Sequence, residues 1–152
     1  MSLDNLIFME TDASVADIQR LLEQRTSFVF AEEVNQFKIM VAEASVLAIR
    51  SANPNEVWIR EFAIRPNLRM TNTYANHTSS ALWKLETMRI VMALLHAYPG
   101  DLMFIYFDLA LVMRKDGRIV LERDIDVWTA GGGPEMLALM DLPYEWGHNP
   151  MP

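Results

Sequence analysis

Residues 79–100 read SSALWKLETMRIVMALLHAYPG, the longest helical signal in the chain. Apolar side chains recur there every three or four positions, so they share one side of an α-helix. Pro99-Gly100 ends the pattern, and Thr78, Ser79 and Ser80 offer alternative N-cap hydroxyls before it. We therefore predict a helix with one broad face buried against a sheet; that face holds Leu85, Met88, Val91, Met92, Leu94 and Leu95.

A shorter helix is predicted nearer the N-terminus. Ser14 supplies an N-cap hydroxyl, Asp17 follows three residues later, and apolar residues then fall on one helical face. We expect this helix to run from Val15 to about Arg25. The alternating residues Leu6–Glu10 before it predict a first β-strand.

The segment between the two helices predicts an antiparallel meander. Ser27–Phe30, Phe37–Val41 and Ser45–Arg50 are rich in β-prone residues and read as successive strands.

A turn and a further strand are expected next. Ser51–Asn55 has Pro54 between two Asn residues, which is turn chemistry and predicts a hairpin. Alternating side chains from Val57 to Ile64 then predict a strand that ends before Pro66. Residues 68–75 have a mixed pattern that favours no element.

A second hairpin is predicted after the long helix. The apolar runs Leu102–Phe107 and Leu109–Arg114 lead through Lys115-Asp116-Gly117 into the β-prone run Ile119–Leu121. We expect the chain to reverse at Gly117.

Two registers are possible for this hairpin. A three-residue turn with Gly117 as a left-handed bulge would place Met113 opposite Ile119. A two-residue turn would instead place Leu111 opposite Glu122. Because the bulged register pairs hydrophobic residues better, we predict that register.

The C-terminal segment is predicted to be extended from about residue 130. Gly131-Gly132-Gly133 before Pro134 breaks regular structure, and Tyr144 and Trp146 suggest packing through aromatic rings. Neither an internal repeat nor a low-complexity linker divides the chain. We therefore expect one α+β domain over residues 1–152, in the order β-α-β-β-β-α-β-β, with a mainly antiparallel sheet and two helices packed on one face.

Composition narrows the class of protein. The 152 residues are 51% hydrophobic and 22% charged, and Cys is absent, which suits a soluble protein in the reducing cytoplasm. The apolar runs are shorter than the roughly 20 residues that span a bilayer, and residues 1–5 do not begin a secretory signal, so no membrane contact is expected. Thirteen Lys and Arg against twenty Asp and Glu give a net charge of -7, which disfavours nucleic-acid binding.

No catalytic, metal-binding or cofactor-binding motif is recognisable. His77, His96 and His148 lack the spacing of a zinc site, so we expect no metal. Gly131-Gly132-Gly133 precedes a proline and lacks a Gly-Lys-Ser/Thr ending, so it predicts a turn and no phosphate cradle. We nominate no catalytic residue, no metal ligand and no cofactor.

The C-terminal half resembles a bacterial family. The resemblance is carried by Met88–Leu95, Pro99–Asp101, Leu111–Leu121, Trp128 and Leu142–Tyr144. This pattern of helix, Pro-Gly-Asp, hairpin and tryptophan is similar to that of the small immunity proteins paired with swarming-inhibition toxins, which are polymorphic toxins. The chain departs from the family pattern in having no clear turn around Asp108.

The resemblance implies a non-catalytic cytoplasmic protein that binds and neutralises a cognate bacterial toxin. Such a protein needs no catalytic residues and accommodates an acidic surface. On electrostatic grounds we predict partner-binding residues Asp124, Asp126 and Trp128, since the two carboxylates would steer a cationic surface and the indole would add contact area. Alternatively, Trp128 belongs to the core.

Two other function classes stay open at this point. A small-molecule-binding or enzymatic α+β domain could assemble a site from distant polar residues such as Glu61, Tyr74, His77 and Asp108. A structural homo-oligomer could instead associate through exposed aromatic residues.

Overall fold

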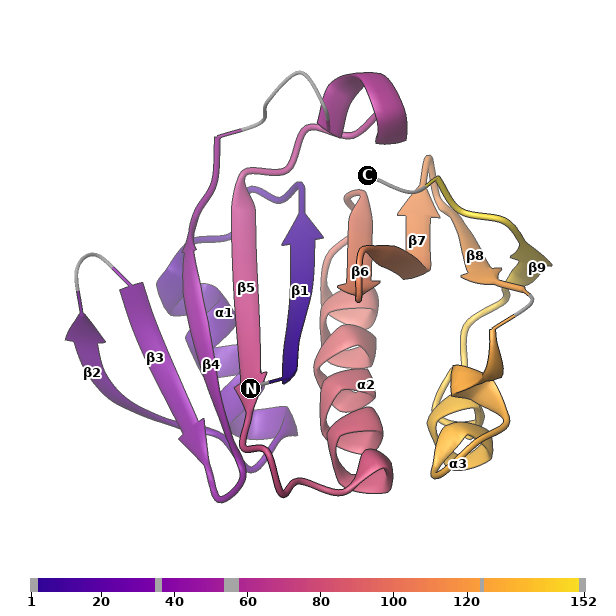
Figure 1. Ribbon diagram of the computed structural model, residues 1–152. Coiled ribbons are helices and arrows are strands. Elements are labelled where there is room, and N and C mark those ends of the chain that lie inside the picture. Colours follow the sequence, from indigo (N-terminus) through magenta and orange to yellow (C-terminus); the bar gives the residue numbers. More distant parts are fainter. Residues whose placement is uncertain (1–2, 35–36, 54–57, 124, 151–152) are drawn as a thin grey trace.

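Strand β1 (Leu3–Met9) lies at the centre of the sheet, between β5 (Leu68–Tyr74) and β6 (Leu102–Tyr106). Figure 1 shows the computed structural model, in which residues 3–34, 37–53, 58–123 and 125–150 are described. In these ranges nine strands form one sheet in the order β2-β3-β4-β5-β1-β6-β7-β8-β9. The remaining strands are β2 (Val29–Val34), β3 (Phe37–Ala42), β4 (Ser45–Ser51), β7 (Leu109–Lys115), β8 (Arg118–Glu122) and β9 (Glu145–Gly147).

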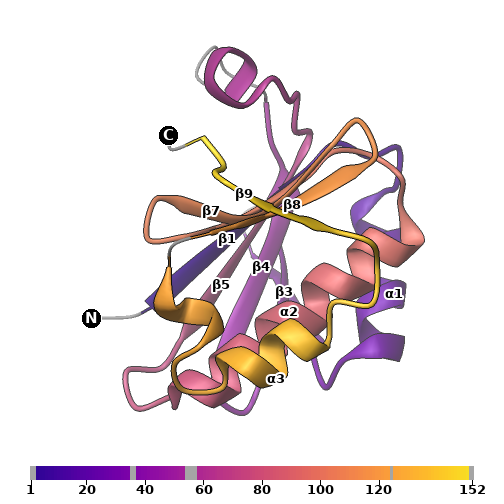
Figure 2. The same cartoon turned by 90° about the vertical axis from the view of Figure 1, so that its right-hand side faces the viewer.

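The α+β class is confirmed, and the sheet is mainly antiparallel as expected. Only β8 and β9 pair in parallel, so the sheet as a whole is mixed. The α-helices α1 (Val15–Arg25), α2 (Ser80–Ala97) and α3 (Gly133–Ala138) lie on the same side of it (Figure 2). The sequence predicted two of these helices on one face and missed α3. The predicted order β-α-β-β-β-α-β-β is also wrong, because the strands and α-helices of the described chain follow the order β-α-β-β-β-β-α-β-β-β-α-β.

Both predicted helices begin where their caps indicate. Ser14 and Asp17 form a complete capping box at the start of α1. The Ser79 hydroxyl accepts a hydrogen bond from the amide of Leu82, so Ser79 is the N-cap of α2. Each cap satisfies backbone N–H groups that have no partner inside the helix, which fixes the first turn.

The main hydrophobic core lies between the helices and the sheet. Its members from α1 and α2 include Ile18, Leu22, Met88 and Leu95, and they pack on inward side chains of the strands. Nine residues of α2 are buried, and they include every member of the predicted apolar face except Leu85, which is only partly buried.

A second, smaller core lies on the opposite side of the sheet. Phe62 and Ile64 cover Phe8, Met103 and neighbouring side chains of β6 and β7. The segment that carries them includes a π-helical turn, Trp58–Phe62, where the sequence predicted a strand. That prediction is wrong: the alternating side chains there pack on a sheet without joining it, and Ala63 has a positive φ of 53°.

The next strand after β4 in the chain is β5, which pairs with β4 and which the sequence pattern left unassigned. Every second residue of β5 is buried, but one of the buried residues is Asn72, a polar side chain that interrupts the hydrophobic alternation. The predicted turn at Ser51–Asn55 falls partly on Pro54 and Asn55, which lie outside the described residues.

The predicted register of the β7–β8 hairpin is wrong. Met113 pairs with Val120 and Lys115 with Arg118, so the turn has two residues. Asp116 and Gly117 both have positive φ, 51° and 81°, which suits the two-residue turn that follows the twist of the strands. Both faces of β7 are buried, so the better hydrophobic pairing of the bulged register was not a reliable guide to the register.

A turn also joins β6 and β7, although the sequence has no turn signal there. Phe107 and Asp108 have φ of 47° and 58°, and Tyr106 pairs with Leu109 across them. Phe107 is a rare residue for this backbone region, which explains why sequence reasoning missed the turn.

The segment after residue 130 is more regular than the extended tail we predicted. The predicted break at Gly131–Pro134 is only partly right, because Gly132 is the N-cap of α3 with a φ of 81°, whereas Gly133 and Pro134 already belong to its first turn. Gly133 packs closely, since a Cβ there would lie 2.3 Å from the carbonyl oxygen of Val127. The expected aromatic packing is present, with the ring of Trp146 6.0 Å from that of Trp128 and 5.6 Å from that of Tyr144.

Candidate functional site

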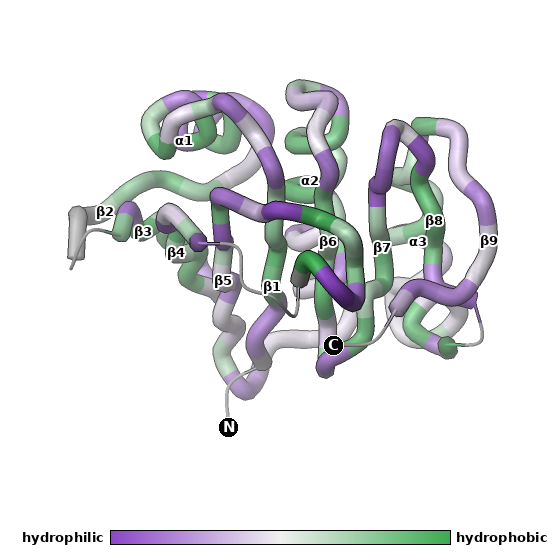
Figure 3. The backbone as a smooth tube through the Cα atoms, turned by 90° about the horizontal axis from the view of Figure 1, so that it is seen from above, coloured by the Kyte–Doolittle hydropathy of each residue, from purple (hydrophilic) through white to green (hydrophobic). Residues whose placement is uncertain are grey.

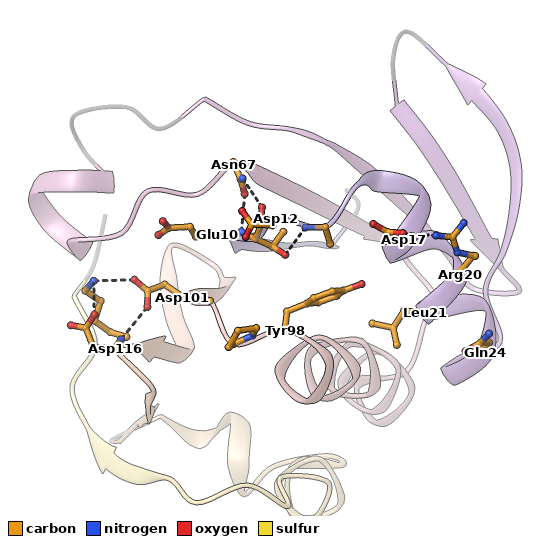
Figure 4. A pocket seen from close by; sticks show the side chains of 15 residues that line it. Glu10, Asp12, Asp17, Arg20, Leu21, Gln24, Asn67, Tyr98, Asp101 and Asp116 are labelled. Atoms are coloured by element: carbon orange, nitrogen blue, oxygen red, sulfur yellow. Dashed lines mark hydrogen bonds and ion pairs between the residues drawn. The ribbon is translucent and has the colours of Figure 1, made fainter.

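A groove of about 1060 Å³ opens where α1, the end of α2 and the β7–β8 hairpin meet (Figure 4). Antiparallel pairing brings these segments together, because Met9 at the end of β1 lies opposite Leu102 at the start of β6. The groove is lined by Glu10, Thr11, Asp12, Ala13, Asp17, Arg20, Leu21, Gln24, Asn67, Tyr98, Pro99, Gly100, Asp101, Lys115 and Asp116.

The groove is acidic. Its lining contains five carboxylates and two cations, so three negative charges are left without a compensating cation. Asp17 is paired with Arg20, and Asp101 with Lys115. Glu10 and Asp12 make no hydrogen bond or ion pair through their carboxylates in the described part of the chain, and their charges face solvent.

The α1 wall of the groove is fixed by the capping box. The amide of Ser14 donates to Asp17 over 3.0 Å, and the amide of Asp17 donates to the Ser14 hydroxyl over 3.1 Å. These hydrogen bonds from Ser14 favour the ionised carboxylate and lower the pKa of Asp17. Asp17 therefore stays negative at neutral pH.

The opposite wall is held by Asp101. Its carboxylate accepts hydrogen bonds from the Lys115 ammonium, 2.9 Å away, and from the amide of Asp116, 3.0 Å away. The bond to Asp101 raises the pKa of Lys115, so the cation persists. Asp101 thereby ties the hairpin tip to the loop after α2.

That loop is anchored from below by a buried arginine, Arg114. Its guanidinium donates to the carbonyl oxygens of Leu95 and Gly100, each over 2.8 Å, and also to that of Tyr98. These carbonyls lie at or beyond the end of α2, where a helix leaves acceptors without partners. Burial lowers the pKa of Arg114, but an arginine remains charged at neutral pH.

The floor of the groove is equally constrained. Asn67 donates to the carbonyl of Thr11 over 2.7 Å and accepts from its amide over 3.0 Å. The amide of Glu10 donates to the carbonyl of Asp101 over 2.9 Å. Gly100 is needed for this approach, because a Cβ there would lie only 1.8 Å from the Glu10 carbonyl oxygen. The carboxylates are therefore presented by a fixed backbone.

The predicted partner-binding residues lie elsewhere. Asp124 is outside the described residues, and Asp126 is exposed at the start of a 3-10 turn, Asp126–Trp128, between β8 and α3. Trp128 is only 4% exposed, and its indole donates to the Glu122 carbonyl over 2.9 Å. Trp128 thus belongs to the core, the alternative that the sequence left open, and the partner role of the two aspartates stays a prediction.

The polar residues considered for an assembled catalytic site lie on separate elements. Tyr74 is buried under α2, where desolvation raises its pKa and its hydroxyl lies 2.6 Å from that of Thr87. Glu61 is paired with Arg60 in the π-helical turn, and Asp108 lies in the β6–β7 turn. His77 is exposed before α2.

No family model, no curated protein and no solved structure matches the chain. Among the described residues, no group of three or more His, Asp or Glu side chains is arranged to hold a metal ion, and no helix is long and apolar enough to span a membrane.

Sequence reasoning missed the groove because its residues come from five separate segments. One signal could have found it: the acidic residues Glu10, Asp12 and Asp101 stand at the ends of the strand and helix patterns. Pairing the first strand antiparallel to the strand after the long helix would have brought them together.

Proposed function

We propose that this chain is a non-catalytic binding protein that neutralises a cognate bacterial toxin through its acidic groove. The observation that carries the proposal is the set of carboxylates on both walls of a wide groove, with Glu10 and Asp12 unpaired in the described chain. The resemblance of residues 88–144 to immunity proteins of swarming-inhibition toxins supports the same function.

The groove suits a protruding cationic segment of a protein. Tyr98 and Leu21 provide contact area between the acidic walls, so a Lys or Arg side chain could place its methylenes on them and its charge near the carboxylates. Because the walls are already fixed by hydrogen bonds, little ordering entropy is lost on binding.

The net charge of the whole chain also favours binding of a cationic partner. A net charge of -7 attracts a basic partner over a distance of about one Debye length, roughly 8–10 Å at physiological salt. Fast capture of a toxin before it reaches its target is the benefit expected from such steering.

The test is protection on co-expression with toxin genes that neighbour this gene. The groove variant combines Glu10→Gln and Asp12→Asn, which remove two charges without breaking a hydrogen bond of the described structure. The matched control combines Asp108→Asn and Glu135→Gln, two exposed carboxylates outside the groove. We expect the native chain and the control to protect, and the groove variant to bind at least about tenfold more weakly, with a slower on-rate at low salt.

Two results would count against the proposal. One is that the native chain protects against none of the neighbouring toxins and does not bind them in purified form. The other is equal weakening by the groove and control pairs, which would assign the effect to net charge alone.

A further inference from the structure

The sheet has a second surface of different character, on the side away from the three α-helices. Seen from above in Figure 3, α1 and α2 lie on one side of the sheet, and no described helix covers the other side of β2–β5. The outward side chains of that half include Val29, Val41 and Val46, which are 64%, 38% and 39% exposed. Val29 pairs with Val41, and Val41 with Val46, so the three form a continuous apolar row.

Two arginines share this face with the valine row. Arg50 lies four residues after Val46 on β4 and therefore points to the same side of the sheet. Its direct neighbour on β5 is Arg69. The Arg50 guanidinium lies 5.1 Å from the Phe37 ring centroid, and that of Arg69 5.8 Å from the Phe8 ring centroid.

Neither arginine has a carboxylate partner in the described part of the chain. Nε of Arg69 is buried and makes no hydrogen bond there. Burial and the neighbouring Arg50 charge both lower the pKa of Arg69, which is the expected sign of an uncompensated cation. Like charges directly opposite each other destabilise a sheet, so this pair does not serve folding.

Both observations describe a surface that lacks its complement. A solvated face of an antiparallel sheet ordinarily carries polar side chains, whereas this one carries an exposed valine row and two guanidiniums that have no carboxylate partner among the described residues. A carboxylate can bond to a guanidinium in a bidentate manner, and aliphatic side chains can cover the valines.

We propose that the outer face of β2–β5 docks a protein segment that carries carboxylates beside aliphatic side chains. This surface is separate from the acidic groove and selects the opposite charge, so it goes beyond the proposed toxin binding. Nucleic acid is the poorer occupant, because the valine row offers its phosphates nothing and the net charge of -7 repels them.

The absence of Cys from the chain allows a direct test. An environment-sensitive dye is attached to Val46→Cys on the full chain, and three synthetic peptides of equal length are titrated: alternating Val/Glu, alternating Val/Lys and alternating Ser/Glu. We expect saturable binding of the Val/Glu peptide alone, with amide NMR shifts confined to β2–β5.

Matched arginine variants identify the charges responsible. Arg50→Gln with Arg69→Gln is expected to weaken Val/Glu binding by about tenfold or more. The control, Arg25→Gln with Arg89→Gln, has the same net charge but changes exposed residues of α1 and α2, so binding should be unchanged. The single variant Arg69→Gln is expected to melt at or above the melting temperature of the native chain. A loss of peptide binding in this variant would then not result from unfolding.

Several outcomes would overturn the proposal. Equal binding of the Val/Lys peptide would mean that the face binds through apolar contact alone, and equal binding of the Ser/Glu peptide would mean that it binds through charge alone. Equal weakening by the control pair would assign the effect to the net charge of the protein. A dye signal that rises with protein concentration, together with a dimer mass by light scattering, would make a second copy the occupant. Failure here leaves the toxin proposal standing, because Glu10→Gln with Asp12→Asn should not alter peptide binding.

Discussion

Replacing Arg114 with Gln should destabilise the protein more than any surface change. Arg114 is 6% exposed, and its guanidinium donates to three backbone carbonyls at and after the end of α2. Glutamine is shorter and neutral, so it cannot reach all three acceptors. The freed carbonyls would be left without partners next to the core.

The size of the effect follows from these bonds. A hydrogen bond to a charged group contributes about 1.5–3 kcal/mol, but three bonds from one guanidinium are not additive and its desolvation offsets part of the gain. We therefore expect a loss of about 3–5 kcal/mol, out of the roughly 5–15 kcal/mol by which a domain of this kind is stable. The melting temperature should fall by roughly 6–20 °C.

The assay is thermal and urea unfolding followed by circular dichroism, with Arg118→Gln as the matched control. Arg118 belongs to the same hairpin, but its side chain is 72% exposed and pairs with Glu145 at the surface. The control should melt close to the native chain. If Arg114→Gln also melts within 2–3 °C of the native chain, roughly 1 kcal/mol, the anchoring role of these bonds is refuted.

Three further predictions concern the fold. Ser14→Ala should cost about 1 kcal/mol of unfolding free energy through the lost N-cap. Since the native Asp17 pKa is depressed below its ordinary 3.8, the ionised carboxylate stabilises the native chain above that pH, and this contribution is lost as the pH falls below it. Urea titrations at pH 7 and pH 3 should therefore show a smaller loss of stability on acidification in the variant than in the native chain. Gly117→Ala should lower the free energy of unfolding, measured from urea curves, by about 1 kcal/mol, because φ is 81° there and an alanine is strained. Tyr74→Phe should cost about 1–3 kcal/mol by leaving Thr87 and its neighbours without their buried hydroxyl partner, measured by the same unfolding curves.

Capping residues and helical periodicity in the sequence predicted the two longer helices, which depend on chemistry between residues close in the chain. The bounds of α1 agree with its capping box, and α2 ends before Pro99 as the pattern indicated. The failures occurred where burial on both faces of a strand removed the alternation, as in β7, or where a polar residue such as Asn72 is buried in a strand.

The groove depended on long-range pairing, which no local pattern contains. Its acidic wall residues were visible as exposed carboxylates, but only the pairing of β1 with β6 brings Glu10 beside Asp101. The Arg50 and Arg69 pair was hidden for the same reason, since the register of β4 and β5 places them side by side.

The central position of β1 has a consequence for how the chain folds. Its partners begin at Leu68 and Leu102, so β1 leaves the ribosome before either of the strands that pair with it and must wait for them. Such distant pairings slow folding, because loop-closure entropy is lost before the contacts form. Meanwhile Ile7, Phe8 and Met9, all buried in the finished sheet, stay exposed to other chains. The nascent chain should therefore depend on chaperones during synthesis more than its size suggests.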